Sequence, residues 1–452
     1  MRMLNRQTIL AHQYDRVPRY TSYPTAPQFR AAEDDRHYRA RLADGLEGPV
    51  SLYLHVPYCR TLCWYCGCHT RATRTDAPVV RYAGALAREL DQVGQIAAGA
   101  VRAGHVHWGG GTPTILPIPQ FLAIAQRIER QFGRAASCET AIEIDPRTFT
   151  EDYANAFVDA GVNRVSIGVQ SQDPAVQRAI NRVQPLDVTH RAAGWLADRG
   201  IDRLNIDLVY GLPHQSVDSV VATVDAVAGL NPSRLSVFAY AHLPRLKRHQ
   251  RLIDDAALPD GPARLDQALA IHDRLTALGY RPIGLDHYAR PDDSMAIADA
   301  AGTLNRNFQG YTTDTHTTLL GFGASAIGAF DDLYVQNTPD IRTYLDAVSQ
   351  GRLPIARQCL LTDDDRLRRA IINRLMTGMS VDLAAEAAAF GRPARAFAVE
   401  RARLQRFADQ GVVSIDGWRI AVAPAYRLLV RSVAAVFDRF LADGETRHAT
   451  AV

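Results

Sequence analysis

Four cysteines gather in one short segment of the chain, which reads Cys59-Arg-Thr-Leu-Cys63-Trp-Tyr-Cys66-Gly-Cys68. The chain has 452 residues and only six cysteines, so a disulfide scaffold is excluded. A thiol cluster of this kind in a reducing compartment indicates metal binding or catalysis. The remaining two cysteines, Cys138 and Cys359, stand alone and are expected to be unreactive, buried thiols.

The spacing of the first three cysteines suits an iron–sulfur cluster better than zinc. Zinc sites usually combine two separated Cys pairs, or a Cys pair with a His pair, and the segment has no second pair. Thiolates of Cys59, Cys63 and Cys66 could instead ligate three irons of a four-iron four-sulfur cluster. One iron would then have no protein ligand and could bind a substrate or cofactor. Zinc and a plain electron-transfer cluster are the alternatives.

Short strands alternate with longer amphipathic stretches between about residues 50 and 290, which is typical of βα units and a parallel sheet. The predicted strands are 51–57, 105–110, 140–145, 164–170, 203–211 and 234–241, with 281–289 as a seventh. The predicted helices include 77–98, 118–132, 216–228 and 263–278. Such units form a closed or incomplete barrel or a doubly wound sheet, and both architectures place function at the carboxyl ends of the strands.

Polar and glycine residues follow these strands at their carboxyl ends. They are His55, Gly109-Gly110-Gly111-Thr112, Glu143, Asp145, Gln170, Asp207 and Ala241-His242. A single strand-end carboxylate is often only a helix cap or a turn former. Such groups on six successive strands favour one shared site.

Two flanking segments break the repeat. Residues 1–35 contain PRYTSYPTA (18–26), with two prolines and no clear period, which predicts an extended arm. The last hundred residues are rich in Ala and Arg at helical spacing, and Asp416-Gly417 between two alternating strands predicts a hairpin at 412–422. Helices followed by such a hairpin resemble a winged helix. Since its arginines are interleaved with acids, a solvated face is favoured over a DNA contact.

Composition indicates a folded, soluble protein. The chain is 47% hydrophobic, and 51 Lys and Arg against 48 Asp and Glu leave a net charge of +3, which disfavours nucleic-acid binding. No stretch approaches the roughly 18 apolar residues of a membrane span, and the first residues lack the apolar segment of a signal peptide. We therefore expect a cytoplasmic protein that binds neither membrane nor nucleic acid.

The C-x3-C-x2-C motif resembles that of the radical S-adenosylmethionine (SAM) superfamily. The chain is similar to one family within it, the oxygen-independent coproporphyrinogen III oxidases, over nearly its whole length. The segments that carry the resemblance are PRYTSYPTA (18–26), LYLHVPYCRTLCWYCGC (52–68), HWGGGTPT (107–114), IEIDPR (142–147), GVQ (168–170), NRVQ (181–184), NIDLVYGLP (205–213), YAHLP (240–244), DHYARPDD (286–293) and RNFQGYTT (306–313).

The resemblance implies a four-iron four-sulfur cluster, two bound SAM molecules and a radical oxidoreductase. The reaction would be oxidative decarboxylation of two propionates of coproporphyrinogen III to vinyl groups, giving protoporphyrinogen IX in haem biosynthesis, with a 5′-deoxyadenosyl radical removing hydrogen from the propionate β-carbon. A small electron-donor protein or another reductant is needed, and we expect a monomer. The fold would be α/β, an incomplete (β/α)6-type TIM-like barrel (36–355), with an N-terminal arm (1–35) and a mostly helical, winged-helix-like C-terminal domain (356–452).

The resemblance also assigns residues, motif by motif. Cys59, Cys63 and Cys66 would ligate the cluster, while Cys68 would not. The first SAM would contact Tyr53, Gly110, Glu143 and Ile327, and the second would contact Tyr65, Gly111, Thr112, Gln170, Arg182, Asp207 and Ala241. The candidate catalytic residues are His55, Tyr53, Glu143 and Arg182. Arg19 and Arg306 are candidates for binding the substrate propionates.

Two other functions compete with this interpretation. A paralogue in haem handling, either a haem chaperone or an anaerobic haem-degrading enzyme, would share the barrel and the cluster. A metal-stabilised nucleic-acid module would instead use the C-terminal region. Tight haem binding without decarboxylation would favour the first, and zinc in the purified protein would favour the second.

Overall fold

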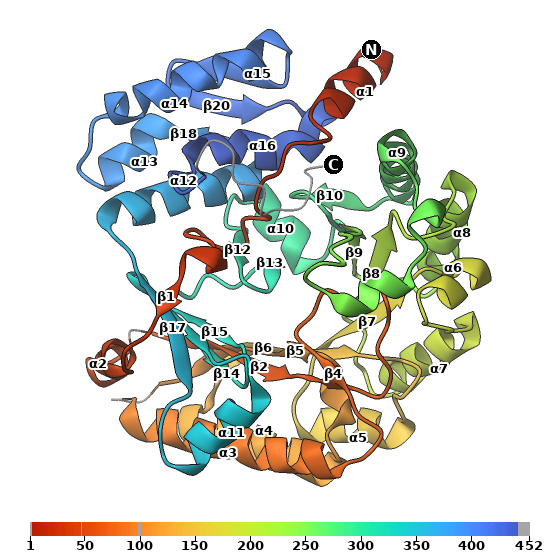
Figure 1. The fold of residues 1–452 in the computed structure, drawn as a ribbon, viewed down its shortest axis with the longest axis vertical. Helices are drawn as coiled ribbons and strands as arrows, with labels where there is room; N and C mark the ends of the chain where they lie inside the picture. Colours follow the sequence, from red (N-terminus) through yellow and green to blue (C-terminus); the bar gives the residue numbers. More distant parts are fainter. Residues whose placement is uncertain (1, 47, 98–100, 442–452) are drawn as a thin grey trace.

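The computed structural model describes residues 2–46, 48–97 and 101–441, and its centre is a thirteen-stranded mixed sheet (Figure 1). Neighbouring parallel strands form the middle of the sheet. In spatial order they are β14 (Leu319–Phe322), β2 (Val50–Val56), β5 (Ala103–Gly110), β6 (Arg134–Ile144), β7 (Arg164–Gln170), β8 (Leu204–Tyr210) and β9 (Arg234–Ala239). These strands are largely buried, as expected of a parallel sheet covered by helices. The predicted α/β class is confirmed.

Helices connect the parallel strands and lie around the outside of the sheet (Figure 1). They are α3 (Ala77–Ile96), α4 (Ile118–Phe132), α5 (Glu151–Asp159), α6 (Pro174–Ala179), α7 (Leu186–Ala197), α8 (Val217–Ala228) and α9 (Gly261–Ala277). The four predicted helices are all present, and residue 98, the predicted end of the first, lies outside the described residues. Trp108, Phe121 and Phe157 are fully buried between sheet and helices and form part of the main core.

The segment 281–289 is not the single seventh strand that we predicted. It forms two short strands, β10 (Arg281–Ile283) and β11 (His287–Ala289), which pair antiparallel, and β11 runs antiparallel to β9. Gly284 lies between them with φ +51°, a conformation that suits glycine and reverses the chain. The seventh parallel strand is β14, which pairs with β2.

Antiparallel strands extend the other side of the sheet. They are β15 (Ile327–Ala329), β16 (Leu333–Asn337), β17 (Ile355–Leu360) and β1 (Arg30–Ala31). The strand order runs from β1 at one edge to β10 at the other, so the sheet has two edges. Smaller elements nearby are β12 (Asn305–Asn307), β13 (Gly310–Thr312), α2 (Arg36–Ala43), α10 (Ser294–Ala300) and α11 (Ile341–Ser349).

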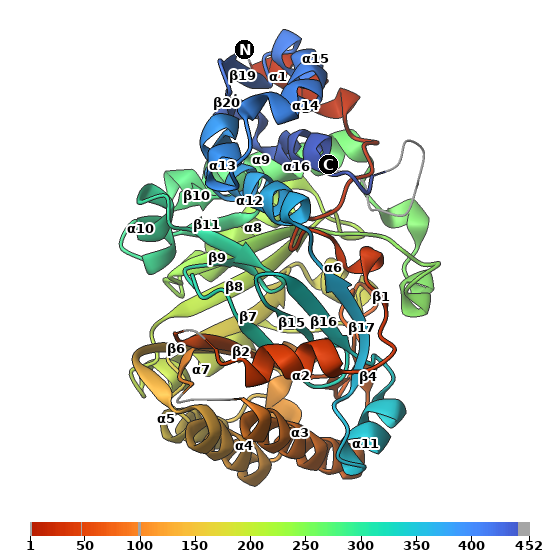
Figure 2. The ribbon, with the colours of Figure 1, turned by 90° about the vertical axis from the view of Figure 1, so that its left-hand side faces the viewer.

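The C-terminal part is mainly helical and lies beyond one end of the sheet (Figure 2). Its helices are α12 (Asp363–Gly378), α13 (Leu383–Ala389), α14 (Ala398–Arg403), α15 (Gln405–Asp409) and α16 (Val430–Ala434). The predicted hairpin is confirmed as β19 (Val413–Asp416) and β20 (Arg419–Val422), and β18 (Ser380–Asp382) adds a third strand that we did not predict. Residues 442–452 of the predicted domain lie outside the described residues.

We predicted an extended arm for the N-terminal segment, but part of it is helical. Residues Arg2–Ala11 form the helix α1, and Ile9 is buried in the core of the C-terminal part. An isolated helix of ten residues is marginal in water, so tertiary packing decides its conformation. The remainder of the arm passes from the C-terminal part to β1, which pairs with β17 (Figure 2). The domain boundaries at 35/36 and 355/356 remain predictions.

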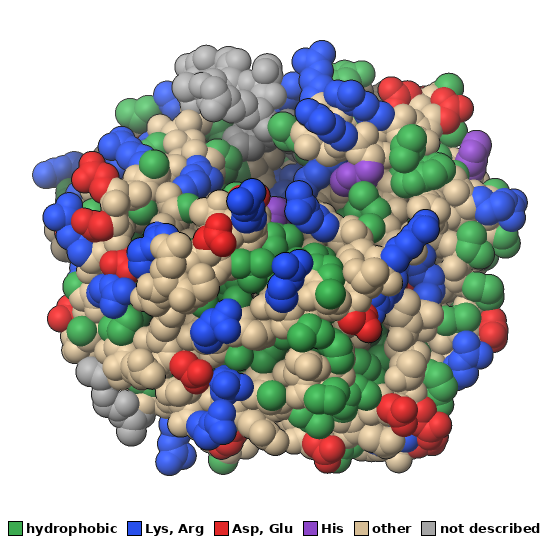
Figure 3. Space-filling view, turned by 60° about the horizontal axis from the view of Figure 1, so that its bottom comes forward, with side chains coloured by type: hydrophobic (Ala, Val, Ile, Leu, Met, Phe, Trp, Pro, Cys, Tyr) green, Lys and Arg blue, Asp and Glu red, His purple; other side chains and the backbone are tan. Residues whose placement is uncertain are grey.

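None of the described helices has the length and apolar character needed to cross a membrane. On the face shown in Figure 3, acidic and basic side chains are interspersed.

Candidate active site

The cysteine segment forms the loop that follows β2 at the carboxyl edge of the parallel sheet. At its two ends, β3 (Tyr58–Cys59) pairs with β4 (Arg71–Ala72). The loop is held from outside, since Trp64 N donates to the Ile180 carbonyl at 2.9 Å and Asn181 Nδ2 donates to the Leu62 carbonyl at 2.9 Å. Cys63 is buried, whereas Cys59 and Cys66 are partly buried. The three thiols are therefore presented by one fixed loop.

Two arginines lie against the sulfur of Cys63. Arg147 Nη2 and Arg182 Nη1 are each 3.6 Å from Cys63 Sγ. Asp145 pairs with both, at 2.6 Å to Arg147 and 3.5 Å to Arg182. Burial opposes ionisation of Asp145, but Arg182 and Arg147 outweigh it and lower its pKa to about 2. Two cations and one anion leave one net positive charge beside this thiol.

The thiols of Cys66 and Cys68 differ in acidity. A hydrogen bond from the Cys68 thiol is the main reason that the pKa of Cys66 falls to about 7, although burial opposes it. The same contact raises the pKa of Cys68 well above its ordinary value. The thiolate is the ligating form of cysteine, and the contact allows one of these two thiols to ionise while the other donates to it. Within the described part of the chain, no three His, Cys, Asp or Glu side chains are grouped so that they could hold a single metal ion.

The glycines after β5 allow close approach to this loop. A Cβ at Gly110 would lie 2.7 Å from the ring of His55, and one at Gly111 would lie 2.5 Å from the Tyr58 carbonyl oxygen. Gly110 also has φ +114°, which other residues rarely adopt. Next to them, Thr112 Oγ1 donates to Cys59 Sγ at 3.4 Å. The strand end thus lies directly against the cysteine loop, and only glycine fits there.

A buried polar group connects β2, β5 and β6. Tyr53 and His55 on β2 are joined through the Tyr53 hydroxyl and His55 Nδ1 at 2.9 Å, and His55 Nε2 lies 2.9 Å from the carbonyl of His69. Since a carbonyl only accepts, Nε2 carries the proton and Nδ1 accepts from Tyr53. Burial lowers the pKa of His55 to about 4, so the imidazole is neutral at pH 7.

Glu143 at the end of β6 lies beside this group. Its Oε1 is 3.1 Å from His107 Nε2, and its Oε2 accepts from Gly110 N at 3.2 Å. Burial opposes ionisation, but these contacts hold the pKa of Glu143 below its ordinary value. Glu143 is therefore a carboxylate at neutral pH.

Two cavities meet at Glu143 and Cys68. The smaller has a volume of about 510 Å³ and is lined by Tyr53, His55, Gly110 and Ile327, with part of the arm. The larger has a volume of about 650 Å³, and its lining includes Tyr65, Gln170, Asp207 and Ala241. Gly111, Thr112 and Arg182 line neither cavity and lie instead beside the cysteines.

Two residues of the larger cavity are unusual. Gln170, the last residue of β7, has φ +71°, a strained conformation for a side chain other than glycine. Asp207 accepts from Ser166 Oγ at 2.9 Å and from Asn205 Nδ2 at 2.8 Å. Burial and the nearby charge of Glu143 nevertheless raise the pKa of Asp207 above its ordinary value. Strain and a raised carboxylate pKa are both common at functional sites.

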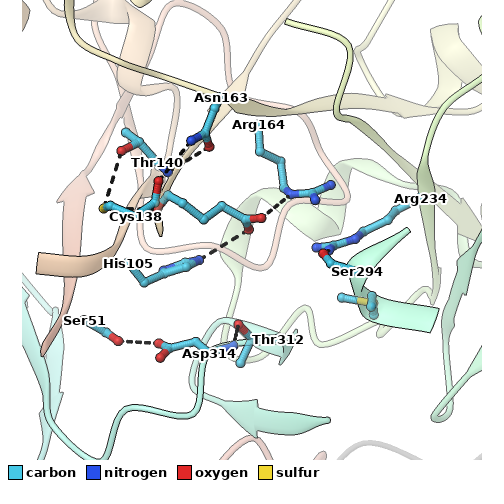
Figure 4. A network of polar contacts seen from close by, with 12 residues as sticks. Ser51, His105, Cys138, Thr140, Asn163, Arg164, Arg234, Ser294, Thr312 and Asp314 are labelled. Carbon is cyan, nitrogen blue, oxygen red and sulfur yellow. Dashed lines mark hydrogen bonds and ion pairs between the residues drawn. The ribbon is translucent and has the colours of Figure 1, made fainter. Parts of the chain in front are cut away.

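A charged network lines part of the larger cavity, and Figure 4 shows His105, Arg164 and Arg234 from it. Arg164 Nε lies 3.0 Å from Glu139, and Arg234 Nε donates to Asp293 at 2.7 Å. His105 Nε2 is 3.5 Å from Glu139. Two arginines are thus matched by two carboxylates.

A buried glutamate holds the turn that carries Ile327. Glu89 on α3 accepts hydrogen bonds from Gly323 N at 2.8 Å, Asn337 Nδ2 at 2.6 Å and the Tyr344 hydroxyl at 2.7 Å. Burial nevertheless raises the pKa of Glu89 to about 7. The titratable carboxyl group of Glu89 therefore holds in place the turn before Ile327, which lines the smaller cavity.

Comparison with known proteins identifies the family. Residues 53–227 match the family model described as "Radical SAM superfamily", and residues 361–429 match "HemN C-terminal domain". The "Oxygen-independent coproporphyrinogen III oxidase" of Bradyrhizobium diazoefficiens is 49% identical over 97% of this chain and 98% of that protein. This chain belongs to the oxygen-independent coproporphyrinogen III oxidase family.

Other members support this assignment. The "Coproporphyrinogen III oxidase, anaerobic 1" of Cereibacter sphaeroides is 42% identical over 94% of both chains. The structure described as "Coproporphyrinogen III oxidase (HemN) from Escherichia coli is a Radical SAM enzyme" superposes with a TM-score of 0.90, at 38% identity, over 95% of this chain and 100% of that one. The mixed α/β fold with a helical C-terminal part is thus shared with a solved structure.

Membership of the radical SAM superfamily implies a four-iron four-sulfur cluster and SAM. The residues of this family member fit both groups. Three thiols on one loop provide the donor set, two arginines face the innermost sulfur, and the glycine strand end leaves space that any side chain would fill. Arg182 Nε is buried and has no hydrogen-bond partner among the described residues, as expected where a ligand completes the site.

Sequence reasoning missed three residues of this site. His107 forms a hydrogen bond with Glu143, and Arg147 contacts the sulfur of Cys63. Lys247 Nζ donates to the Cys68 carbonyl at 3.0 Å. His107 and Arg147 lie within the segments that carry the resemblance, and His107 alternates with buried His105 on a strand, which was a usable signal. Lys247 gave none, because its loop meets the cysteine loop only through the tertiary fold.

Proposed function

We propose that this chain is a radical SAM enzyme that converts coproporphyrinogen III to protoporphyrinogen IX by oxidative decarboxylation of two propionates. The observation that carries the proposal is the pair of cavities that meet at Glu143 and Cys68, in the loop that also carries Cys59, Cys63 and Cys66. A bound four-iron four-sulfur cluster would supply the electron for cleavage of SAM, and SAM would supply the 5′-deoxyadenosyl radical needed to remove hydrogen from a propionate β-carbon.

The cluster would be held by Cys59, Cys63 and Cys66, with Cys68 left unligated. Arg147 and Arg182 would stabilise the negative charge of a thiolate-ligated cluster through N–H groups on Cys63.

One SAM molecule would occupy each cavity. All four residues assigned to the first SAM, Tyr53, Gly110, Glu143 and Ile327, line the smaller cavity. Of those assigned to the second, Tyr65, Gln170, Asp207 and Ala241 line the larger cavity. Gly111, Thr112 and Arg182 line neither cavity, but Thr112 contacts Cys59 and Arg182 contacts Cys63. This separation supports a stoichiometry of two.

Each polar residue would have a distinct task. Glu143, ionised and fixed by His107 and Gly110, would accept hydrogen bonds from a ribose or an ammonium group. His55 would act as a positioning residue, because both its nitrogens are engaged and its ring is neutral. Arg182 would bind a carboxylate with the part of its guanidinium that has no partner.

We further propose that the protein works as a cytoplasmic monomer that binds neither membrane nor nucleic acid, with a small electron-donor protein or another reductant as its source of electrons. Interspersed surface charges and a net charge of +3 support the last point (Figure 3).

An anaerobic product assay tests the proposal. Reconstituted protein with a chemical reductant, SAM and coproporphyrinogen III should release 5′-deoxyadenosine and protoporphyrinogen IX. Cys66→Ser should abolish both products, while Cys359→Ser, which changes a cysteine outside the loop, should retain them. Tight haem binding with neither product would instead favour the haem-handling function.

A further inference from the structure

The segment that follows β9 carries a local excess of positive charge beside the cysteine loop. We call residues 243–252, which read LPRLKRHQRL, the basic loop; it contains no Asp or Glu. Its lysine and arginine residues are Arg245, Lys247, Arg248 and Arg251, and the three arginines are exposed. Since the whole chain has a net charge of only +3, four cations in one short loop form a distinct positive surface.

These cations are not neutralised within the described part of the chain, where none of the four forms an ion pair with a carboxylate. Lys247 Nζ and Arg251 Nε donate instead to uncharged backbone carbonyls, at 3.0 and 3.2 Å. The two acids that follow the loop bind their own neighbours. Asp254 accepts from a backbone N–H at 3.0 Å, and Asp255 lies 2.8 Å from His242 Nε2. The basic loop therefore keeps an excess of positive charge that a partner can meet.

The basic loop also exposes two large apolar side chains. Leu246 is 72% exposed and Leu252 is 59% exposed. A single exposed leucine needs no explanation, but two of them among four cations without ion pairs combine the apolar and charged groups of a protein interface.

The basic loop lies directly against the backbone of the cysteine loop. His249 Nε2 donates to the Cys66 carbonyl at 2.7 Å, and Gln250 Nε2 donates to the Tyr65 carbonyl at 3.0 Å. Lys247 makes the third such contact, with the Cys68 carbonyl. A protein seated on the basic loop would therefore be separated from the cysteine thiols only by this loop.

The three arginines of the basic loop are not placed to bind a molecule inside the cavities. Lys247 and Gln250 line the larger cavity, whereas Arg245, Arg248 and Arg251 line neither the larger nor the smaller one. Their exposed charges are directed to the surface of the molecule and not to the substrate.

We propose that the basic loop is the docking surface for a small acidic electron-transfer protein that reduces the cluster. This inference rests on the proposed function, which requires one electron for each SAM that is cleaved. The donor would lose one electron and the oxidised cluster would gain it, with no bond made or broken. Complexes between redox partners are typically small, and complementary charge guides and orients them.

Binding of an acidic plant-type ferredoxin, a low-potential iron–sulfur protein, to the reconstituted enzyme tests the surface. Anaerobic biolayer interferometry would compare the wild type with a variant that combines Arg245→Gln, Arg248→Gln and Arg251→Gln. At low salt this variant should bind about tenfold more weakly, because it loses three charges that attract the partner, and its affinity should depend less on salt. Leu246→Ser should weaken binding without changing the salt dependence.

The matched control combines Arg395→Gln, Arg403→Gln and Arg406→Gln. These are three exposed arginines of the C-terminal part, so the net charge changes equally, and the control should bind ferredoxin like the wild type. Thermal unfolding should be the same for both triple variants, since every substituted side chain is exposed. If the wild type does not bind the ferredoxin, or the basic-loop variant binds it within twofold of the wild type, the docking surface is refuted.

Product formation with two reductants separates this inference from the proposed function. With ferredoxin as the only reductant, the basic-loop variant should form protoporphyrinogen IX about tenfold more slowly than the wild type, and with excess dithionite the two should be equal. An equal loss with both reductants would refute the docking role, because the loop would then serve the substrate. If the wild type forms no product even with dithionite, the proposed function is refuted, whereas a loss of ferredoxin binding confined to the basic-loop variant would still support the surface.

Discussion

Replacing Arg147 by Gln should make the reduction potential of the bound cluster more negative. Arg147 Nη2 lies 3.6 Å from Cys63 Sγ, so its positive charge stabilises the extra electron of the reduced cluster. Gln keeps a polar group at the position but removes the charge. Asp145 keeps its second partner, Arg182, at 3.5 Å, so the variant leaves no buried carboxylate without a partner.

The size of the effect follows from Coulomb's law. The added electron spreads over the whole cluster, so its mean distance from the guanidinium is about twice the contact distance, ~7 Å, and at an effective dielectric constant of 20 the interaction is about 2.4 kcal/mol. A tenfold change in a one-electron equilibrium, 1.4 kcal/mol, corresponds to 59 mV, so the expected shift is roughly 100 mV. Solvent reaching the loop would reduce this value but not change its sign.

The assay is an anaerobic redox titration of reconstituted protein followed by electron paramagnetic resonance of the reduced cluster. Arg147→Lys keeps the charge on a shorter, single-point donor and should recover most of the potential. Arg130→Gln, which removes an exposed arginine near the end of α4, is the matched control and should not shift it. If Arg147→Gln titrates within about 20 mV of the wild type, the electrostatic role assigned to Arg147 is wrong.

Three further predictions concern the walls of the site. Because the pKa of Glu89 is raised to about 7, its contribution to folding stability should be fully present below the unfolded pKa near 4.5 and should fall by up to about 3 kcal/mol as pH rises to 7. Urea unfolding should show this fall as the difference in pH dependence between the wild type and Glu89→Gln. Glu143→Gln should weaken SAM binding by about tenfold in equilibrium dialysis, since it removes the buried carboxylate, and unchanged binding would exclude Glu143 from the site. Ile9→Ala should destabilise the C-terminal core by about 2–4 kcal/mol in urea unfolding, and no loss would show that α1 contributes nothing to it.

The sequence predicts well those features that depend on neighbouring residues. The strands from 51–57 to 234–241 appear in the fold because their apolar runs and the helices between them are local patterns. Glu143, Gln170 and Asp207 reach the cavities because parallel strands end at one edge of the sheet. The prediction of one strand at 281–289 was wrong because the same apolar pattern can form one long strand or two short ones. Gly284 was the only local sign of the turn between them.

Features that depend on tertiary packing could not be predicted in this way. The helix α1 forms because Ile9 packs into the core of the C-terminal part, and no local sequence pattern predicts this packing. The contact between Arg147 and Cys63 joins residues 84 positions apart.

The distribution of charge singles out the cluster site. The chain as a whole is nearly neutral, and Arg164 and Arg234 in the larger cavity are matched by carboxylates. Beside Cys63, two arginines face one aspartate, which leaves one positive charge. A thiolate-ligated cluster is an anion and would neutralise this charge. Since an unmatched buried cation costs free energy, binding the cluster should raise the unfolding temperature of the protein.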